Sequence, residues 1–483
     1  MNKKQRKEID RREFLKVLGA GAAASTAALY GCGGGTSQGN STGSTASGEI
    51  PTDRMTYRTT PTTGDKVSLL GYGCMRWPLR QKADGSGEEV DQDMVNELVD
   101  YAIAHGVNYF DTSPRYVRGW SETATGIALK RHPREKFFIA TKLSNFPDDA
   151  SLRRREGAIA MYRQSMKNLQ VDYIDYYLIH GAGLGTPVLD NESSGGDEGA
   201  MGAIKERLFE GDVLDFLLNE KKEGRIRNLG WSFHGDLKVF DYLLQLHDQD
   251  RVKWDFVQIQ MNFVDWKHAS GWNINAEYLY GELAKRNISV VIMEPLLGGR
   301  LSTLNNHLIS RLKQRRPEDS IASWSFRFAG TYPHVLTVLS GMTYMEHLQD
   351  NVRTYSPLDP CTEEELDLLE DTAVMMLKYP TVPCTTCEYC MPCPYGLNIP
   401  AIFAHYNRCV NEGNVPENSQ SENYRQARRA FLVSYDRSVP RLRQANHCIG
   451  CNQCTPHCPQ SIKIPEQLHR IDDFVEQLKQ ERI

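Results

Sequence analysis

Short apolar runs alternate with amphipathic segments from about residue 65 to residue 355 of this 483-residue chain. The amphipathic segments repeat apolar positions at helical spacing, whereas the apolar runs have the length of buried strands. Strands that alternate with helices predict βαβ units and a parallel sheet. We expect strands at Ser68–Cys74, Asn108–Thr112, Phe137–Leu143, Tyr173–His180, Ile226–Phe233, Phe256–Phe263, Ser289–Glu294 and Val335–Ser340. We expect helices between them at Met94–His105, Ser121–His132, Gly157–Leu169, Val213–Glu223 and Ala276–Arg286.

Eight such strands in about 290 residues are typical of a (β/α)₈ TIM barrel. The rival arrangement is a doubly wound open sheet, which binds dinucleotides through a G-x-G-x-x-G turn after its first strand. No such turn follows Ser68–Cys74. The pattern therefore predicts an α/β chain with a barrel domain at residues 56–358.

Chemically active side chains stand at the carboxyl ends of three predicted strands. Asp111 ends the second strand, Lys142 lies near the end of the third and His180 ends the fourth, while Tyr116 follows Asp111 on a loop. In a barrel these strand ends meet at the face that carries catalysis. Each residue alone has an ordinary structural explanation, but a lysine inside an apolar run is costly unless it is paired. Together they predict an active site.

Three segments carry a resemblance to a known family. They are Gly106–Ser113 followed by Tyr116 and Ser121-Glu122, then Ile139–Lys142, then Asp172–His180. In this order they resemble the signature of the aldo/keto reductases. The resemblance implies an oxidoreductase that acts on a carbonyl or alcohol, with Asp111, Tyr116, Lys142 and His180 as catalytic residues. Tyr116 would give the proton, aided by a Lys142 ammonium that lowers its pKa and is paired with Asp111, and His180 would orient the carbonyl.

The same resemblance marks a nicotinamide site that is only partly present. Ser232 and Gln258 match family positions that hold the carboxamide, and Asn351 matches a residue that contacts the adenine. Glu294 stands where the family has a tyrosine that stacks on the nicotinamide. Both cations that clamp the 2′-phosphate of NADP in the family are missing. We therefore expect NAD(P)H to bind weakly.

The cysteines point to iron. Eight of the twelve lie in two groups, Cys384 to Cys393 and Cys448 to Cys458. The second group is C-x₂-C-x₂-C-x₃-C-P, the bacterial ferredoxin run, and the first is the same run with one residue fewer before its last cysteine. In two-cluster ferredoxins the fourth cysteine of each run binds the other cluster. The runs predict two [4Fe–4S] clusters, one held by Cys384, Cys387, Cys390 and Cys458 and the other by Cys448, Cys451, Cys454 and Cys393.

Zinc is the alternative metal, because structural zinc sites also use C-x-x-C pairs. Four cysteines in one run before a proline are unusual for zinc. We expect a small, mainly helical ferredoxin-like domain at residues 359–483. The order of barrel and cysteine runs resembles the branch of the aldo/keto reductases that has a C-terminal 4Fe-4S domain.

The first residues predict an export signal. Arg11-Arg12 precede a small-residue apolar stretch, Val17 to Tyr30, and Leu29–Cys32 resembles a lipobox. We interpret residues 1–32 as a twin-arginine signal and residues 33–55, rich in Gly, Ser and Thr, as a linker. The alternative is a short amphipathic helix with a basic tail. The twin-arginine route carries folded cargo, which suits a cluster protein, and predicts a periplasmic or cell-surface location with any membrane association made through the signal or a lipid on Cys32.

The formal net charge is −5, and no long basic run gives reason to expect nucleic acid. A reductase barrel moves two electrons at once, whereas a cluster moves one, and no flavin motif bridges the difference. The leading hypothesis is an oxidoreductase whose clusters pass electrons between a redox partner protein and a small-molecule substrate. The alternatives are a non-catalytic redox relay that uses the barrel as a scaffold, and an ordinary NAD(P)H-dependent carbonyl reductase.

Overall fold

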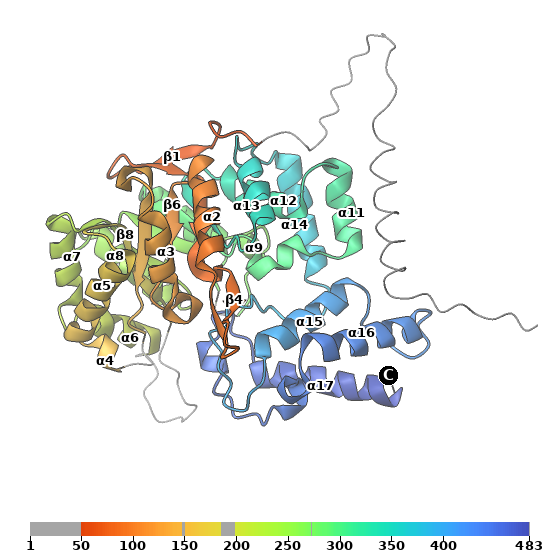
Figure 1. Ribbon diagram of the computed structural model, residues 1–483. Coiled ribbons are helices and arrows are strands. Elements are labelled where there is room, and N and C mark those ends of the chain that lie inside the picture. The colour runs from red at the N-terminus through yellow and green to blue at the C-terminus, as the bar shows by residue number, and fades with distance from the viewer. Residues whose placement is uncertain (1–49, 147–149, 185–198, 272, 483) are drawn as a thin grey trace, which may run out of the picture. The chain divides into compact units, whose positions relative to one another are not determined.

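The computed structural model describes residues 50–146, 150–184, 199–271 and 273–482, so the predicted signal and most of the predicted linker lie outside it. The expected (β/α)₈ barrel is confirmed: eight parallel strands close in the order β10-β11-β12-β3-β6-β7-β8-β9, with helices outside them (Figure 1). The strands are β3 (Leu70–Gly73), β6 (Tyr109–Asp111), β7 (Phe138–Leu143), β8 (Ile174–Ala182), β9 (Ile226–Phe233), β10 (Phe256–Gln260), β11 (Ser289–Met293) and β12 (Val335–Ser340).

Two short antiparallel pairs flank the first barrel strand, β1 (Tyr57–Thr59) with β2 (Lys66–Ser68) and β4 (Leu79–Gln81) with β5 (Glu88–Val90). The helices of the barrel region are α2 (Gln92–Ala104), α3 (Ser121–Leu129), α4 (Ala150–Arg153), α5 (Arg155–Leu169), α6 (Gly199–Leu208), α7 (Val213–Lys222), α8 (Leu237–Asp248), α9 (Asp265–His268), α10 (Ala276–Lys285), α11 (Asn306–Arg315), α12 (Ile321–Thr331), α13 (Met345–Thr354) and α14 (Glu363–Met376). The later helices are α15 (Ile399–Asn411), α16 (Tyr424–Ser438) and α17 (Ile464–Gln480).

The strands divide their side chains between two apolar layers. In β8, Tyr176 and Leu178 belong to the core inside the barrel, whereas Tyr177 and Ile179 pack in the layer between the strands and the helices. This division follows from the two-residue period of a strand. Burying each of these side chains contributes about 1.5–3 kcal/mol.

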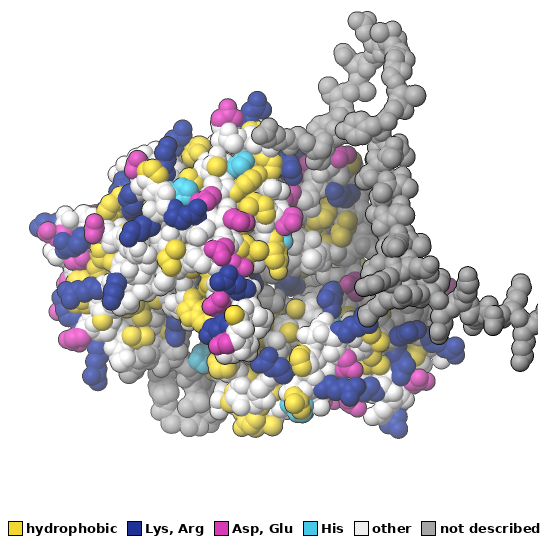
Figure 2. Space-filling view, in the orientation of Figure 1, with side chains coloured by type: hydrophobic (Ala, Val, Ile, Leu, Met, Phe, Trp, Pro, Cys, Tyr) yellow, Lys and Arg dark blue, Asp and Glu magenta, His cyan; other side chains and the backbone are white. Residues whose placement is uncertain are grey.

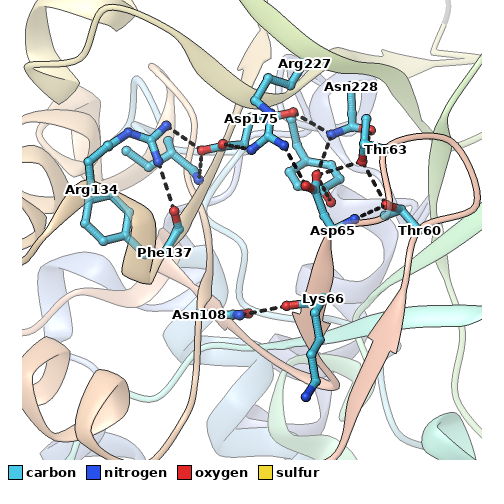
Figure 3. A network of polar contacts seen from close by, with 12 residues as sticks. Thr60, Thr63, Asp65, Lys66, Asn108, Arg134, Phe137, Asp175, Arg227 and Asn228 are labelled. Atoms are coloured by element: carbon cyan, nitrogen blue, oxygen red, sulfur yellow. Dashed lines mark hydrogen bonds and ion pairs between the residues drawn. The ribbon is translucent and has the colours of Figure 1, made fainter.

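A polar network closes the end of the barrel where the strands begin (Figure 3). Arg227, at the start of β9, donates to Asp65 at 2.6 Å and to Asp175 at 3.2 Å. Arg134 reaches the other oxygen of Asp175 at 2.6 Å. The buried carboxylates are thus paired, which leaves the opposite face of the barrel as the one open to chemistry.

The C-terminal region has an apolar core of its own. Phe403 of α15, Phe431 of α16, and Leu468 and Phe474 of α17 pack together there, and cysteines of both groups line its edge. Helix α14 packs instead in the core of the barrel, through Leu369 and Ala373. Among the described residues, we find no helix that combines the length and the apolar character needed to cross a membrane.

Candidate active site and metal centre

The four predicted catalytic residues lie together at the carboxyl face of the barrel. The ammonium of Lys142 in β7 pairs with Asp111 at the end of β6 and donates to the carbonyl oxygen of Thr112 at 2.9 Å. The same ammonium lies 4.9 Å from the ring centre of Tyr116. The Tyr116 ring centre is 6.0 Å from that of His180, with the two rings nearly perpendicular.

Burial and pairing oppose each other in the Asp111–Lys142 pair. Burial raises the pKa of the Asp111 carboxyl, and the Lys142 charge pulls it back down. Burial lowers the pKa of Lys142, and Asp111 raises it again. Each ion is therefore held in the interior by the other, so removing either one leaves an uncompensated buried charge.

Tyr116 differs from the expectation drawn from its lysine neighbour. Burial raises its pKa well above the ordinary value, and the acidic groups of Tyr389, Asp111 and Glu294 raise it further. Lys142 lies beside the face of the ring, and its effect does not prevail. Tyr116 is thus held as the neutral phenol, which is the form that can give up a proton.

His180 is fixed in position by a short chain of polar contacts. Its Nδ1 is 2.6 Å from the hydroxyl of Ser144, which lies 3.0 Å from the hydroxyl of Ser113. Arg207 donates to the carbonyl oxygen of His180 at 2.6 Å. Burial and the charge of Lys142 lower the pKa of the imidazole well below its ordinary value. His180 is therefore a neutral, oriented side chain that can hydrogen-bond a substrate oxygen.

Of the residues predicted to bind nicotinamide nucleotide, some have polar atoms available for a ligand and others are already hydrogen-bonded within the protein. Ser232 accepts a hydrogen bond from the N–H of Gly181 at 2.8 Å, and the side-chain carbonyl of Gln258 is buried with no donor among the described residues. That free acceptor fits a carboxamide. Asn351, however, donates to Ser340 at 2.9 Å, so its amide already has an internal partner.

The first predicted cysteine set lines one small cavity. Cys384, Cys387, Cys390 and Cys458 all line it, although Cys458 comes from the second sequence group. Burial raises the pKa of the Cys390 thiol, and the thiols of Cys387, Cys384 and Cys458 raise it further. The remaining walls are mostly apolar and include Ile399, Phe403, Ile462 and Ile464. Four thiols in an apolar cavity fit a cubane.

The second predicted set also comes together. Burial raises the pKa of Cys454 to about 11, with further contributions from Cys448, Cys451 and Cys393. No group of His, Cys, Asp or Glu side chains in the described residues converges as a single metal ion requires. The grouping of Cys393 with three cysteines of the second run is the one that the two-cluster ferredoxin pattern predicts.

The first cysteine segment packs onto the carboxyl face of the barrel. Arg76, just after β3, donates to the carbonyl oxygen of Thr385 at 2.8 Å and to the Thr386 hydroxyl at 3.2 Å. Gly298, after β11, lies so close that a Cβ there would stand 2.2 Å from the Thr385 carbonyl oxygen. Only glycine tolerates this approach, and its positive φ of 66° favours glycine as well.

Tyr389, between Cys387 and Cys390, links the cysteines with the catalytic residues. Burial raises the pKa of its phenol, and Cys387, Glu294 and Asp111 are close enough to raise it further. Tyr389 in turn raises the pKa of Tyr116. The predicted cluster site and the predicted substrate site are therefore neighbours.

Sequence reasoning missed three residues of this junction, namely Tyr389, Arg76 and Arg300. Arg300 donates to Thr381 at 3.0 Å, and its charge opposes the rise that burial causes in the pKa of Cys384. An aromatic residue inside a C-x-x-C gap and an arginine three residues after a barrel strand were the available signals. Neither signal predicts a functional residue until the cysteine segment is known to contact the barrel.

Comparisons with known proteins agree with this architecture. The profile of the aldo/keto reductase family matches residues 69–372, and the profile of a 4Fe-4S dicluster domain matches residues 383–464.

Individual relatives match the barrel portion. A probable aldo-keto reductase 1 of Glycine max is 33% identical over 176 residues, which are 34% of this chain and 45% of that protein. Protein tas of Escherichia coli is 25% identical over 336 residues, covering 62% of this chain and 93% of that protein. Among solved structures, an aldo-keto reductase from Bacillus halodurans in its holo form has a TM-score of 0.48 and 24% identity, covering 66% of this chain and 96% of that one.

Proposed function

This chain belongs to the aldo/keto reductase family and carries a 4Fe-4S dicluster domain, and we propose that it reduces a carbonyl substrate with electrons supplied through two [4Fe–4S] clusters. The observation that carries the proposal is the contact of the first cysteine segment with the carboxyl face of the barrel. There Arg76 bonds Thr385, and Tyr389 lies near Tyr116. A domain that merely shared the chain would have no need to meet the catalytic face.

The protein's own residues account for binding and proton transfer. The neutral imidazole of His180, fixed by Ser144, would hold the carbonyl oxygen. Tyr116 would pass its phenolic proton to that oxygen as negative charge develops on it, since an alkoxide is more basic than a phenolate. Lys142, paired with Asp111, would then stabilise the tyrosinate left behind.

The cysteines divide into two ligand sets in this proposal. Cys384, Cys387, Cys390 and Cys458 would hold the cluster beside the barrel, and Cys393, Cys448, Cys451 and Cys454 would hold the other. When bound, each cluster supplies one electron at a time. Reduction of a carbonyl to an alcohol takes up two electrons and two protons, of which Tyr116 would give the one on oxygen and water the one on carbon. Arg300, close to Cys384, would offset the negative charge of its cluster.

An ordinary NAD(P)H-dependent carbonyl reductase is the second candidate. The free acceptor of Gln258 favours it, because a carboxamide could donate there. Against it stand Glu294 in place of a stacking aromatic ring, the internal bond of Asn351 and the packing of Thr385 on Gly298. A non-catalytic relay would leave the buried Asp111–Lys142 pair without a use. We also propose export by the twin-arginine route to the periplasm or cell surface, on the strength of Arg11-Arg12 and the sequence around Cys32.

Anaerobic purification followed by a visible spectrum and by iron and sulfide analysis tests the proposal. Two cubanes predict about eight iron and about eight sulfide per chain, with broad sulfur-to-iron absorbance that dithionite bleaches. Stoichiometric zinc without that absorbance would overturn it. A spectrum dominated by a flavin would indicate that electrons pass from the clusters to the substrate through a flavin and not directly.

A further inference from the structure

The two cysteine sets differ in how closely they approach solvent. In the first set Cys458 is buried, and the other three cysteines are only partly accessible. In the second set Cys451 is exposed. The first set lies beside the barrel, near Tyr389. The second set is therefore the one that a partner in solution could approach.

Large apolar side chains stand in solvent around the second set. Leu442 is 80% exposed, Ile449 62% and Tyr395 47%. Ile449 lies between Cys448 and Cys451 in the sequence, and Tyr395 follows Cys393 by two residues. Exposed apolar side chains grouped beside a functional centre indicate a binding surface.

Hydrogen bonds tie these segments into one surface. Arg443 donates to the carbonyl oxygen of Gly396 at 3.3 Å, next to Tyr395. The ring of His447 is 3.1 Å from the carbonyl oxygen of Arg441, which joins the turn of Leu442 to the segment of Ile449. We call the surface made of Tyr395, Arg441, Leu442, Arg443, Ile449 and Cys451 the port surface.

The charge around the port surface is opposite to that of the whole chain. Residues 424–458 contain six arginines and one acidic residue, Asp436, whereas the chain as a whole has a net charge of −5. Arg425, Arg429 and Arg437 line a groove along α16, which leads into this segment. Lys and Arg side chains are visible over α16 in Figure 2. The positive charge thus lies on α16 and on the turn that leads from it to the second cysteine set.

We propose that the port surface docks an acidic protein that carries single electrons, and that this protein reduces the second cluster. The inference rests on the proposed function and adds the partner's chemistry and its place of binding. In the transfer the carrier loses one electron, the cluster gains it, and no bond or proton moves. A second copy of the chain is disfavoured as the occupant, because it would bring the same positive charge. A small, charge-guided contact suits electron-transfer encounters, which bury little area and release quickly.

Stopped-flow measurement of cluster bleaching tests this with the full chain. The probe is a photoreduced, strongly acidic [2Fe–2S] ferredoxin, mixed with the oxidised protein without oxygen. We expect the second-order rate constant to fall as salt rises, because attraction between opposite charges is screened. Arg441→Glu should lower the rate constant at low salt about tenfold. Leu442→Gln should lower it too, with the salt dependence unchanged.

Arg251→Glu is the matched control, since Arg251 and Arg441 are both exposed arginines that pair with an exposed aspartate. Its rate constant should equal that of the wild type. Dithionite should bleach every variant to the same extent. If dithionite bleaches them normally but Arg441→Glu reacts like Arg251→Glu, or if salt speeds the reaction, the port surface is refuted while the proposed function stands. If Arg441→Glu changes only sedimentation with phosphatidylglycerol vesicles, the surface binds a membrane and the inference is wrong. Absence of dithionite bleaching in the wild type would refute the proposed function as well.

Discussion

At the scale of the residue, the surroundings of Tyr116 decide how the candidate site could work. Its phenol is buried among Tyr389, Asp111 and Glu294, all of which oppose its ionisation. A phenol in such a place stays protonated at neutral pH. Proton transfer would then wait for negative charge to build up on the substrate oxygen. The site therefore favours transfer concerted with reduction over a tyrosinate formed beforehand.

Replacing Tyr116 by phenylalanine removes one hydroxyl, which is the proposed proton donor. We expect Tyr116→Phe to lower the rate of carbonyl reduction by ~10²–10⁴-fold, the usual contribution of a positioned acid. Lys142→Met should act in the same direction. The measurement is turnover of a carbonyl substrate with an excess of reductant.

Tyr109→Phe provides the control for this substitution. Tyr109 is a fully buried tyrosine of β6, two residues before Asp111, and its hydroxyl has no hydrogen-bond partner among the described residues. Turnover should therefore stay near that of the wild type. Equal turnover of Tyr116→Phe and the wild type would mean that the four residues no longer catalyse.

The sequence predicted residues whose chemistry is local and missed those defined by distant contacts. Asp111 and Tyr116 belong to one short motif, and Lys142 was conspicuous as a charge inside an apolar run. Tyr389 and Arg76 gain their meaning only from the meeting of segments about 310 residues apart, as the Arg76–Thr386 bond illustrates. The rise in the pKa of Tyr116 was missed for the same reason.

At the scale of the element, helix α14 shows how local signals and long-range pairing combine. Thr362 and Glu365 form a capping box at its start, each side chain bonding the backbone N–H of the other. Glu365 also meets the guanidinium groups of Arg316 and Arg327. Burial opposes ionisation of Glu365, but these two arginines outweigh it and lower the pKa to about 2. The cap therefore also anchors the helix to the barrel.

This anchor predicts a pH-dependent loss of stability. With a folded pKa of about 2 against an ordinary 4.5, ionised Glu365 stabilises the fold fully above about pH 4.5, and the effect fades as the pH falls toward 2. Glu365→Gln should therefore cost about 3 kcal/mol at pH 7, seen as a lower unfolding temperature. The difference from the wild type should narrow as the pH falls below about 4.5.

Glu364→Gln tests whether any charge on α14 would give the same result. Glu364 is an exposed neighbour that pairs with Arg315 at 3.0 Å. Surface pairs contribute about 0–1 kcal/mol, so its unfolding temperature should change little. Equal effects of the two substitutions at pH 7 would contradict the role given to the buried cap.

The cysteine runs allow a prediction about cluster number. Cys451→Ser should remove one cluster and lower the iron content from about eight to about four atoms per chain, because a cubane needs its fourth ligand. The remaining cluster should keep its absorbance. Iron and sulfide analysis after anaerobic purification measures this.

Cys409→Ser is the comparison for that experiment. Cys409 is buried in the core of the C-terminal region, where its sulfur lies 3.4 Å from His405, and it belongs to neither ligand set. Its iron content should stay at about eight. An unchanged iron content in Cys451→Ser would refute the assignment of the second set.

Elements were predictable where the apolar pattern alone fixes them. The predicted bounds of β9 and β12 coincide with the observed ones, because both strands are almost wholly buried. Strand β10 ends at Gln260, three residues before the predicted end. The reason is Asn262, whose side-chain oxygen accepts from the N–H groups of Val264 and Asp265 and so turns the chain into α9. A side chain that caps a helix can look like the polar position of a strand.

At the scale of the whole molecule, the barrel has the family's fold, while its sequence predicts an incomplete nucleotide site. We expect NADPH to bind weakly and with little preference over NADH. Two missing charge-assisted contacts to the 2′-phosphate, each worth ~1.5–3 kcal/mol, would weaken NADPH by ~10²–10⁴-fold. Asn351 is bonded to Ser340 and offers no compensation.

Calorimetric titration of the protein with NADPH, and in parallel with NADH, measures this. NADH is the matched control, since it lacks only the 2′-phosphate. A submicromolar dissociation constant for NADPH at neutral pH would contradict this prediction and would favour an ordinary nicotinamide-dependent reductase.

The joint between barrel and cysteine domain was beyond sequence reasoning. The cysteine spacing predicted a cluster domain but carried no information on where that domain packs. Gln460 follows the last cysteine by two residues, yet it bonds Gln260 of β10 at 3.1 Å and Asn273 at 2.9 Å. No sequence pattern predicts hydrogen bonds between amide side chains that lie so far apart in the chain.

The close packing of Thr385 on Gly298 has a consequence for the maturation of the newly made protein. The segment that would hold the first cluster also packs against Gly298 on the carboxyl face of the barrel. In a newly made chain without iron, this segment would be less ordered. The surroundings of Tyr116 would then be less ordered as well. Such a chain could not turn over substrate even when given an artificial reductant. Cluster insertion would thus act as a checkpoint, because protein that lacked its clusters would be inactive and would not reduce substrate.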